Sequence, residues 1–335
     1  MGQLMIKPVP GNRLEVNFYC WAVIRTNSGT KDLFLVYGKY FERNYGIFTP
    51  DEQERIKTAR VVIVGCGGIG GVIALALARS GFEKFVLYEH DTYQPSNMNR
   101  QIECFAHTLG ENKAAVIYRA MREINPAIEA EVYERALRPE EIDQAIDQGD
   151  VILPVADEWP LSIHMLDRSI DRGKPAVLSY PVGALSRVST FLPGGPYASE
   201  CLVMPFRANY ETLARFMDDP NNRRILLYYQ TAGAWREDWF QSWCEGGKPH
   251  AQLCTPVWIA GSLTAMEVVK LVTGRWEPVA APRYWHITPE GGRVARFSVA
   301  RRLLSRATRY DWGERLLPAL ARRPWLVRMF TRLIG

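Results

Sequence analysis

A glycine-rich turn between two apolar runs limits the fold of this chain more than any other feature. Residues 61–64 predict a buried parallel strand, and residues 69–79 predict the helix that follows it. The glycines of the turn let backbone approach a phosphate, because no Cβ atom is in the way. The free N–H groups of the helix and the positive end of its dipole point at an anion bound there. These glycines are Gly65, Gly67, Gly68, Gly70 and Gly71.

An acidic residue follows the next predicted strand. That strand is residues 84–88, and Glu89 comes directly after it, 24 residues beyond Gly65. In a βαβ unit an acid at this place binds the hydroxyl groups of a ribose. Residues 60–101 therefore predict a nucleotide-binding unit. Strand–helix–strand alternation continues to residue 155, which predicts an α/β fold with an open, doubly wound, mostly parallel sheet.

A polar cluster directly after Glu89 is not needed in a nicotinamide or flavin enzyme. It comprises Asp91, Ser96, Asn97, Asn99, Arg100 and Gln101, and Lys113 starts a further predicted helix. An arginine and a lysine beside a helix N-terminus suit a triphosphate, whose negative charge has to be neutralised while it shifts during a reaction. The alternative interpretation is a polar loop that caps the second strand.

At these residues the sequence resembles the ubiquitin-activating-enzyme-like superfamily of ThiF, MoeB and HesA. The family signature reads GxGGxG, an acid after the second strand, SNxxRQ, and a lysine that starts a helix. This chain has GCGGIGG, Glu89, SNMNRQ at residues 96–101 and GENK ending at Lys113, and the resemblance covers residues 40–274. It implies a homodimeric enzyme that binds MgATP and adenylates a carboxylate, commonly the C-terminus of a ubiquitin-like or sulfur-carrier protein, or of a peptide.

The resemblance also implies roles for individual residues. Arg100 and Lys113 would neutralise the triphosphate, Asp157 would hold Mg²⁺, and Arg43 would reach the phosphates of the partner subunit. The family often has DxxDN around the metal acid, whereas this chain has PVADE, which lacks the first acid and ends in Glu158. The alternatives are a surface arginine at position 43 and a helix N-cap at Asp157. The implied nucleotide-binding set is Gly65, Gly67, Gly68, Gly70, Glu89, Asp91, Asn97 and Gln101.

The six cysteines are widely spaced and form no C-x-x-C pair. This spacing argues for reduced thiols in a cytoplasm and against a four-cysteine structural zinc, which several of the resembled enzymes carry. Cys254 precedes the long apolar helix predicted at residues 255–273. It is the best candidate for taking the activated carboxylate as a thioester, because a helix N-terminus lowers a thiol pKa. An inert buried thiol is the commoner role of such a residue.

The predicted adenylation domain is residues 40–299, after a small β element at residues 1–39. Residues 197–254 are rich in aromatic side chains. In the resembled enzymes this zone includes a crossover loop and the substrate-recognition surface, although aromatic residues at this density more often form core. Residues 182–192, 283–287 and 293–299 predict an antiparallel addition to the sheet. Glu267 and Lys270 predict a pair on the helix surface.

The last segment of the chain is basic. Residues 293–335 contain eleven arginines and two acids, so their net charge is +9. The net charge of the whole chain is +5, which leaves about −4 for the other residues. Residues 300–335 predict a basic amphipathic tail that contacts an anionic membrane surface or tRNA, or a helical appendage that packs on the core. The N-terminus lacks the apolar stretch of a secretory signal, and no apolar run approaches the ~20 residues that span a bilayer. The expected location is therefore cytoplasmic.

Adenylation is the predicted function, and three alternatives stay open. A tRNA threonylcarbamoyladenosine dehydratase-like enzyme has similar motifs and would use the basic tail to hold RNA. A nicotinamide dehydrogenase would need a proton donor, and the five histidines form no cluster in the sequence. A non-catalytic scaffold would keep the fold without the ATP residues, and the presence of Arg100, Lys113 and Asp157 argues against it.

Overall fold

The computed structural model describes residues 37–219, 222 and 234–299. The chain divides into two compact units, residues 1–40 and 41–335, and the fold below belongs to the second. Residues 1–36, which hold most of the predicted N-terminal β element, and the predicted basic tail at residues 300–335 lie outside the described residues.

An eight-stranded sheet with the order β3-β2-β1-β4-β5-β6-β7-β8 forms the centre of this unit. Neighbouring strands from β3 to β5 pair in parallel, whereas β6, β7 and β8 join by antiparallel pairing. The predicted α/β fold, with its mostly parallel sheet and antiparallel C-terminal portion, is confirmed. The strands are β1 Arg60–Val64, β2 Lys84–Tyr88, β3 Glu129–Tyr133, β4 Val151–Pro154, β5 Ala176–Ser179, β6 Ser186–Phe191, β7 Arg283–Thr288 and β8 Gly291–Arg296.

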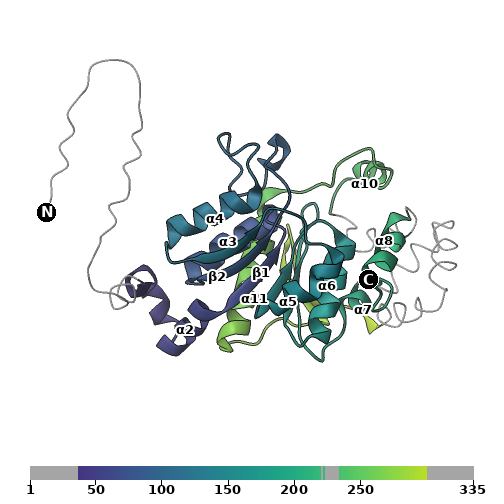
Figure 1. Cartoon of the computed structure of the whole chain (residues 1–335). Helices are drawn as coiled ribbons and strands as arrows, with labels where there is room; N and C mark the ends of the chain where they lie inside the picture. Colours follow the sequence, from purple (N-terminus) through teal and green to yellow (C-terminus); the bar gives the residue numbers. More distant parts are fainter. Residues whose placement is uncertain (1–36, 220–221, 223–233, 300–335) are drawn as a thin grey trace, which may run out of the picture. The chain divides into compact units, whose positions relative to one another are not determined.

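Helices cover both faces of the sheet (Figure 1). One core joins α2, α3, α4 and α11 to one face, and a second core joins α5, α6, α7 and α8 to the other. Strands β1 and β4 are apolar because both of their faces are buried. The helices are η1 Glu42–Gly46, α2 Pro50–Thr58, α3 Gly68–Ser80, η2 Pro95–Asn97, α4 Lys113–Ile124, η3 Pro139–Glu141, α5 Ile142–Asp147, α6 Trp159–Asp171, α7 Ala198–Leu202, α8 Tyr210–Asp218, α10 Glu237–Cys244 and α11 Cys254–Thr273.

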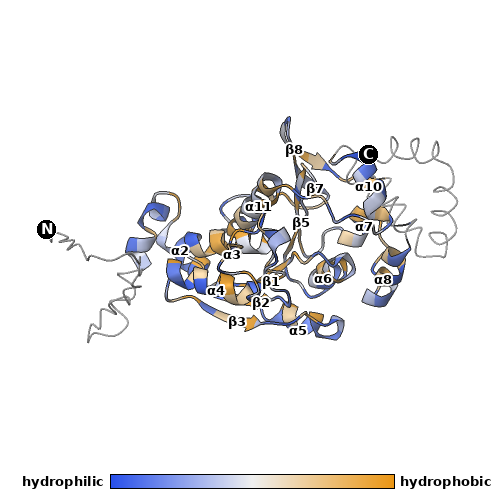
Figure 2. Cartoon of the chain, turned by 90° about the horizontal axis from the view of Figure 1, so that it is seen from above, coloured by the Kyte–Doolittle hydropathy of each residue, from blue (hydrophilic) through white to orange (hydrophobic). Residues whose placement is uncertain are grey.

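Helix α11 corrects one expectation about apolar length. It has 20 residues and is long and apolar enough, by length and composition, to cross a membrane. Its composition follows from its packing against α2, α3, β5 and β6. At Gly261 the backbones of α11 and α3 approach so closely that an added Cβ would lie 2.8 Å from Val72. Figure 2 shows α3 largely in the orange that marks apolar residues.

Glu267 and Lys270 do not form the predicted surface pair, because Glu267 is completely buried. Its Oε1 accepts hydrogen bonds from Lys270 Nζ at 2.6 Å and Trp285 Nε1 at 2.9 Å. Its Oε2 accepts from the Val279 N–H at 2.7 Å and the Thr190 hydroxyl at 3.1 Å. The carboxylate therefore ties α11 to β6, to β7 and to the loop before β7.

The strand predicted from residue 182 begins only at Ser186, because a tight turn precedes it. The Val182 N–H donates to the Leu185 carbonyl at 2.9 Å, and the Leu185 N–H donates back at 2.8 Å. Gly183 has φ +54, and an added Cβ would lie 2.0 Å from the Ala234 carbonyl oxygen. Backbone geometry of this kind requires glycine.

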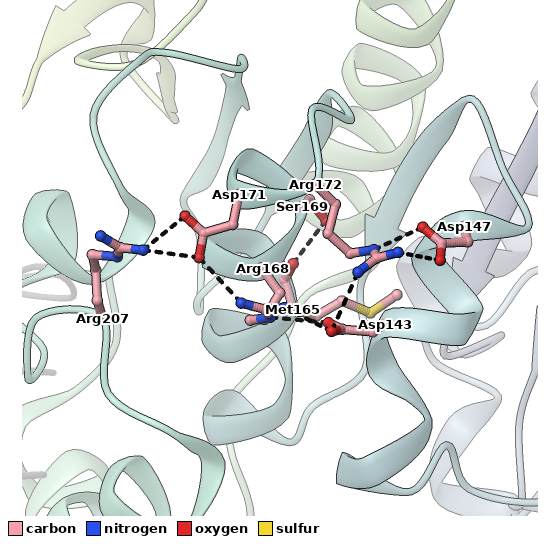
Figure 3. Close-up of polar contacts among 8 residues, drawn as sticks. All are labelled: Asp143, Asp147, Met165, Arg168, Ser169, Asp171, Arg172 and Arg207. Atoms are coloured by element: carbon pink, nitrogen blue, oxygen red, sulfur yellow. Dashed lines mark hydrogen bonds and ion pairs between the residues drawn. The ribbon is translucent and has the colours of Figure 1, made fainter.

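A chain of ion pairs fastens α6 to its neighbours (Figure 3). Arg168 donates to both oxygens of Asp143 on α5, at 2.9 and 2.6 Å. At the other end of this chain of ion pairs, Arg207 contacts both oxygens of Asp171, the last residue of α6, at 3.0 and 3.2 Å. Each pair is partly exposed and stabilises the fold little by itself. Together the pairs hold α6, whose N-terminal end contributes to the site described next.

Candidate functional site

A cavity of about 490 Å³ opens at the carboxyl ends of the parallel strands. Its lining comes from the ends of these strands and the segments that follow β1 to β5, together with residues between 243 and 257. In doubly wound sheets ligands bind at this edge where the strand order reverses, which here lies between β1 and β4. Nine of the residues predicted from sequence line it: Gly65, Gly67, Gly68, Glu89, Asp91, Arg100, Gln101, Lys113 and Asp157.

The glycine turn forms the floor of the cavity at the start of α3. Gly65 has φ +98, and an added Cβ would lie 2.6 Å from the Ala156 nitrogen, so the turn packs directly against the end of β4. At Gly70 an added Cβ would lie 1.9 Å from the Gly65 carbonyl oxygen. Gly70 does not line the cavity. Its lack of a side chain lets α3 begin directly on the turn.

Glu89 fastens the glycine turn to the loop after β2. Its Oε2 accepts from the Cys66 N–H and its Oε1 from the Asp91 N–H, both at 2.9 Å. The side chain is buried at the cavity wall. Because a carboxylate oxygen accepts more than one hydrogen bond, Glu89 keeps acceptor capacity toward the cavity.

Lys113 is the first residue of α4, and its ammonium group faces Asp91. The distance from Lys113 Nζ to Asp91 Oδ2 is 2.8 Å, and the Lys113 N–H donates to the Asp91 carbonyl at 3.0 Å. Lys113 is only 5% exposed. A buried ammonium needs an anionic partner. Asp91 supplies that partner and holds the charge at the cavity wall.

Arg100 and Asp157 bring opposite charges to the same side of the cavity. The Arg100 guanidinium donates to the Ser96 carbonyl at 3.0 Å and to Asn99 Oδ1 at 2.8 Å. Burial lowers the pKa of Arg100, and the nearby Asp157 carboxylate opposes that shift. Arg100 stays cationic at neutral pH, because its ordinary pKa is above 12.

Asp157 is exposed, and among the described residues its carboxylate has no hydrogen-bond partner. The N-cap of α6 is Glu158, without a side-chain cap, so the alternative role of Asp157 as a helix cap is wrong. Magnesium takes one or two carboxylates together with phosphate oxygens and water. A free carboxylate beside a cavity of this kind fits that requirement.

A second acidic group lies directly after β2. Ligand atoms of Glu89, His90 and Asp91 lie within 4.8 Å of one another. Lys113 already neutralises Asp91, and both Glu89 oxygens accept backbone N–H groups. These contacts favour a role in holding the cavity wall.

Three further predicted residues lie outside the lining. Asn97 is buried, and its Oδ1 accepts from the Gln94 N–H at 3.0 Å. Arg43 is exposed on η1. Cys254 is the first residue of α11 and is half-buried. Their implied roles stay predictions.

Sequence reasoning missed the part of the cavity near β5. On residues that line the cavity, three buried polar atoms have no hydrogen-bond partner within the described part of the chain: Gln101 Oε1, Ser179 Oγ and His250 Nδ1. A buried polar atom without a partner is costly, so three around one cavity indicate a polar ligand. The position of Ser179 at the end of a strand was a usable signal. No pattern in the sequence singled out His250.

Aromatic rings surround His250. Its ring centroid lies 5.5 Å from that of Trp243, in a T-shaped contact, and 4.8 Å from that of Trp235. Across the cavity lining, Trp159 and Tyr180 form another T-shaped pair at 5.5 Å. Burial, with a smaller contribution from Arg100, lowers the pKa of His250 to about 4. The imidazole is therefore neutral at pH 7.

Comparison with known proteins matches the ThiF family to residues 41–305. A sulfur carrier protein adenylyltransferase of Thermus thermophilus is 31% identical over 128 residues, which are 38% of this chain and 47% of the relative. The adenylyltransferase and sulfurtransferase MOCS3 of Xenopus laevis is 33% identical over 125 residues, 37% of this chain and 28% of the relative. A tRNA threonylcarbamoyladenosine dehydratase of Bacillus subtilis is 29% identical over 140 residues, 42% of this chain and 55% of the relative. These matches span about half the length of the relatives or less.

Solved structures share the fold. The E. coli MccB structure with ATP has a TM-score of 0.58 at 19% identity and covers 81% of this chain and 71% of that one. The E. coli MccB structure with succinimide has a TM-score of 0.59 at 20% identity and covers 76% and 69%. At this identity the likeness supports the architecture described above.

Proposed function

This chain belongs to the ThiF family, and from that premise we propose that it is an ATP-dependent adenylyltransferase. It would join the AMP part of ATP to a carboxylate and release pyrophosphate. The observation that carries the proposal is the meeting of Arg100, Lys113 and Asp157 around the glycine turn in one cavity. The names of the Thermus and Xenopus relatives, both adenylyltransferases, support it.

In the proposed reaction a carboxylate oxygen attacks the α-phosphorus of ATP. A new O–P bond forms, and the bond from the α-phosphorus to the bridging oxygen breaks, with its electron pair leaving on pyrophosphate. Arg100 and Lys113 stabilise the negative charge that shifts toward the leaving group. The N-terminus of α3 points its N–H groups at the phosphates. No side-chain base is needed, because the carboxylate is already ionised at neutral pH.

Asp157 would hold Mg²⁺, with Glu158 as a neighbouring acid at the cavity rim. When bound, the ion would neutralise phosphate charge and favour the departure of pyrophosphate. Gln101 Oε1 on the nucleotide side, which no described residue hydrogen-bonds, would accept from a ribose hydroxyl or a water.

The proposed test is ATP–pyrophosphate exchange, in which label passes from pyrophosphate into ATP when a carboxylate substrate is present. Arg100→Ala and Lys113→Ala are expected to lose exchange, because each removes a charge facing the leaving group. Arg119→Ala is the matched control, since Arg119 lies on α4 with Lys113 but is exposed and paired with Glu111. A protein that does not retain MgATP, or charge-removing variants with unchanged exchange, would refute the function.

The acceptor is proposed to be a ubiquitin-like or sulfur-carrier protein, or a peptide. The sulfur carrier protein adenylyltransferase among the relatives supports the first class, and the MccB structures solved with MccA have the same fold. A tRNA threonylcarbamoyladenosine dehydratase-like activity is the second candidate, supported by the Bacillus subtilis relative. ATP–pyrophosphate exchange that is stimulated by tRNA, and not by any protein or peptide, would favour the dehydratase-like activity.

A homodimer is proposed in which Arg43 completes the partner's site. The exposed position of Arg43, outside the lining of its own cavity, supports this arrangement. Mixing Arg43→Ala with Arg100→Ala subunits would then restore activity, because each mixed dimer has one intact site. No recovery on mixing would place Arg43 outside the reaction.

The protein is proposed to be cytoplasmic, with residues 300–335 contacting an anionic membrane surface or tRNA. The concentration of arginine in this segment supports the proposal. Removal of residues 300–335 is expected to shift the protein from the membrane pellet to the supernatant. An unchanged distribution, together with unchanged tRNA retention, would contradict it.

A further inference from the structure

The cavity extends past the nucleotide side to the end of β5. Glu89 follows β2, so the ribose lies on the β2 side, and the glycine turn after β1 takes the phosphates. In the sheet order β3-β2-β1-β4-β5 the proposed metal residue Asp157 follows β4, and the β5 side beyond it has no assigned nucleotide group. Ser179 at the end of β5 and residues 180–182 form part of this free side. We call it the β5 compartment.

The outer wall of the β5 compartment comes from the C-terminal end of α10 and the segment that joins it to α11. Trp243 and His250 face the cavity there. Two contacts hold this segment in place: the Gly183 N–H donates to the Ala251 carbonyl at 2.9 Å, and Asn99 Nδ2 donates to the Gln252 carbonyl at 3.1 Å. Asn99 is the immediate neighbour of Arg100. The wall is thus fixed against the side of the cavity where the reaction is proposed to occur.

The walls of the β5 compartment are aromatic and carry no charge of their own, while Arg100 and Asp157 lie close enough to His250 to act on it electrostatically. These walls are Tyr180, Trp243 and the imidazole of His250, which is neutral at pH 7. Two polar atoms there, Ser179 Oγ and His250 Nδ1, are buried and have no hydrogen-bond partner in the ranges that the structure describes. In the proposed reaction Arg100 and Asp157 face the carboxylate, the phosphates and the metal, so a further charged group among these walls would lose its hydration without a countercharge of its own. A large neutral group would bury its surface against these rings, and one that carries a hydrogen-bonding atom would also satisfy a polar atom.

We propose that the β5 compartment binds the side chain of the residue whose carboxylate is activated, and that this side chain is large and uncharged, with an aromatic ring fitting best. A glycine terminus would leave the compartment empty. The inference rests on the proposed adenylation, because it takes the carboxylate to lie between Arg100, Asp157 and the α-phosphate. It names the substrate class as a polypeptide that ends in a large neutral residue.

Sulfamoyl adenosines with an N-acetylaminoacyl group are suitable probes, because they join the adenosine part to a chosen side chain without a reaction. Affinities of the full-length protein would be measured by calorimetry for the glycyl, phenylalanyl, aspartyl and lysyl compounds, and for AMP. Burying an aromatic ring is expected to make the phenylalanyl compound bind roughly tenfold to a hundredfold more tightly than the glycyl one.

Trp243→Ala is expected to remove most of this gain, and His250→Gln part of it, while binding of AMP and of the glycyl compound stays unchanged. His250→Gln keeps the segment uncharged and serves if Trp243→Ala does not fold. Trp276→Ala is the matched control, since it removes an exposed indole that does not line the cavity. Its affinities should equal those of the wild type.

Three results would overturn the inference. Equal or tighter binding of the glycyl compound would mean that no side-chain pocket exists. Preference for the aspartyl or lysyl compound would mean that the compartment takes a charge. An equal loss of AMP affinity in Trp243→Ala and His250→Gln would show that the compartment holds the base. In each case AMP binding by the wild type leaves the adenylation proposal standing, whereas a wild type that binds neither AMP nor any analogue refutes adenylation itself.

Discussion

Replacement of Glu267 by alanine is expected to destabilise the fold strongly. The Glu267 carboxylate is completely buried and accepts four hydrogen bonds, from Lys270, Trp285, Val279 and Thr190. The variant leaves the Lys270 ammonium, whose side chain is 11% exposed, without its anion. It also leaves three neutral donors without an acceptor.

The size of the effect follows from these contacts. Breaking a buried ion pair by removing one partner costs about 3–5 kcal/mol. Each orphaned neutral donor would add about 1–3 kcal/mol where water cannot enter the space left by the side chain. Since a domain unfolds at about 5–15 kcal/mol, the lower bound alone removes a large part of the stability. We therefore expect a loss of at least about 3 kcal/mol.

The assay is urea unfolding followed by tryptophan fluorescence and circular dichroism. With an m-value of about 1–3 kcal/mol/M, the midpoint should fall by about 1 M or more. Met266→Ala on the same helix is the control, because Met266 is 47% exposed and should change stability by less than about 0.5 kcal/mol. Glu267→Ala with Lys270→Met should cost less than the sum of the two single changes. A loss below about 1 kcal/mol in Glu267→Ala would refute the reasoning.

Three shorter predictions concern the site and its support. Gly65→Ala is expected to abolish nucleotide binding in a titration, because the new Cβ would lie 2.6 Å from the Ala156 nitrogen. The control is Gly246→Ala, where φ is +79 and nothing lies within 4 Å of the new Cβ, and this variant should bind nucleotide normally. Asp157→Asn is expected to lower magnesium-dependent exchange on the order of a hundredfold, with metal-free nucleotide affinity unchanged; equal loss of both would contradict a metal-holding role. Burial raises the pKa of Asp167 from its ordinary 3.8 to about 6. The protonated side chain therefore contributes about 3 kcal/mol to the free energy of unfolding below about pH 4, and this contribution is lost as the pH rises through 6. Asp167→Asn should remove that dependence, and identical pH profiles of urea midpoints for variant and wild type would disprove it.

The nucleotide side of the cavity was predictable because its residues are nearly contiguous in the sequence. Gly65, Glu89, Arg100 and Lys113 belong to one βαβ unit and the loop after it, so local spacing alone brings them to one sheet edge. The parallel order of the strands followed from the same alternation of strands and helices. The antiparallel pairing of β6, β7 and β8 followed from alternating runs and a turn.

The β5 compartment was not predictable, because its walls come from two segments about sixty residues apart. Residues 180–182 and 243–252 meet only through tertiary contacts such as the hydrogen bond from Gly183 to Ala251. Aromatic density in residues 197–254 favoured core over a binding surface, and the structure contains both: Phe240 is buried, whereas Trp243 lines the cavity. The surface position predicted for Glu267 was wrong for a similar reason. Its spacing from Lys270 correctly indicated a pair, but a helix that is apolar on several sides does not reveal which side other elements cover.

The division of the cavity between separate stretches of chain has an evolutionary consequence. Apart from Arg43, every group assigned to activating ATP lies in residues 65–158, and the wall by Trp243 and His250 belongs to a later stretch of the chain. Mutations in that later stretch would change substrate selectivity while the residues that activate ATP are inherited unchanged. Exchange of residues 243–252 between paralogues would then transfer substrate selectivity. This short stretch is therefore the first place to mutate when the enzyme is engineered to accept new substrates.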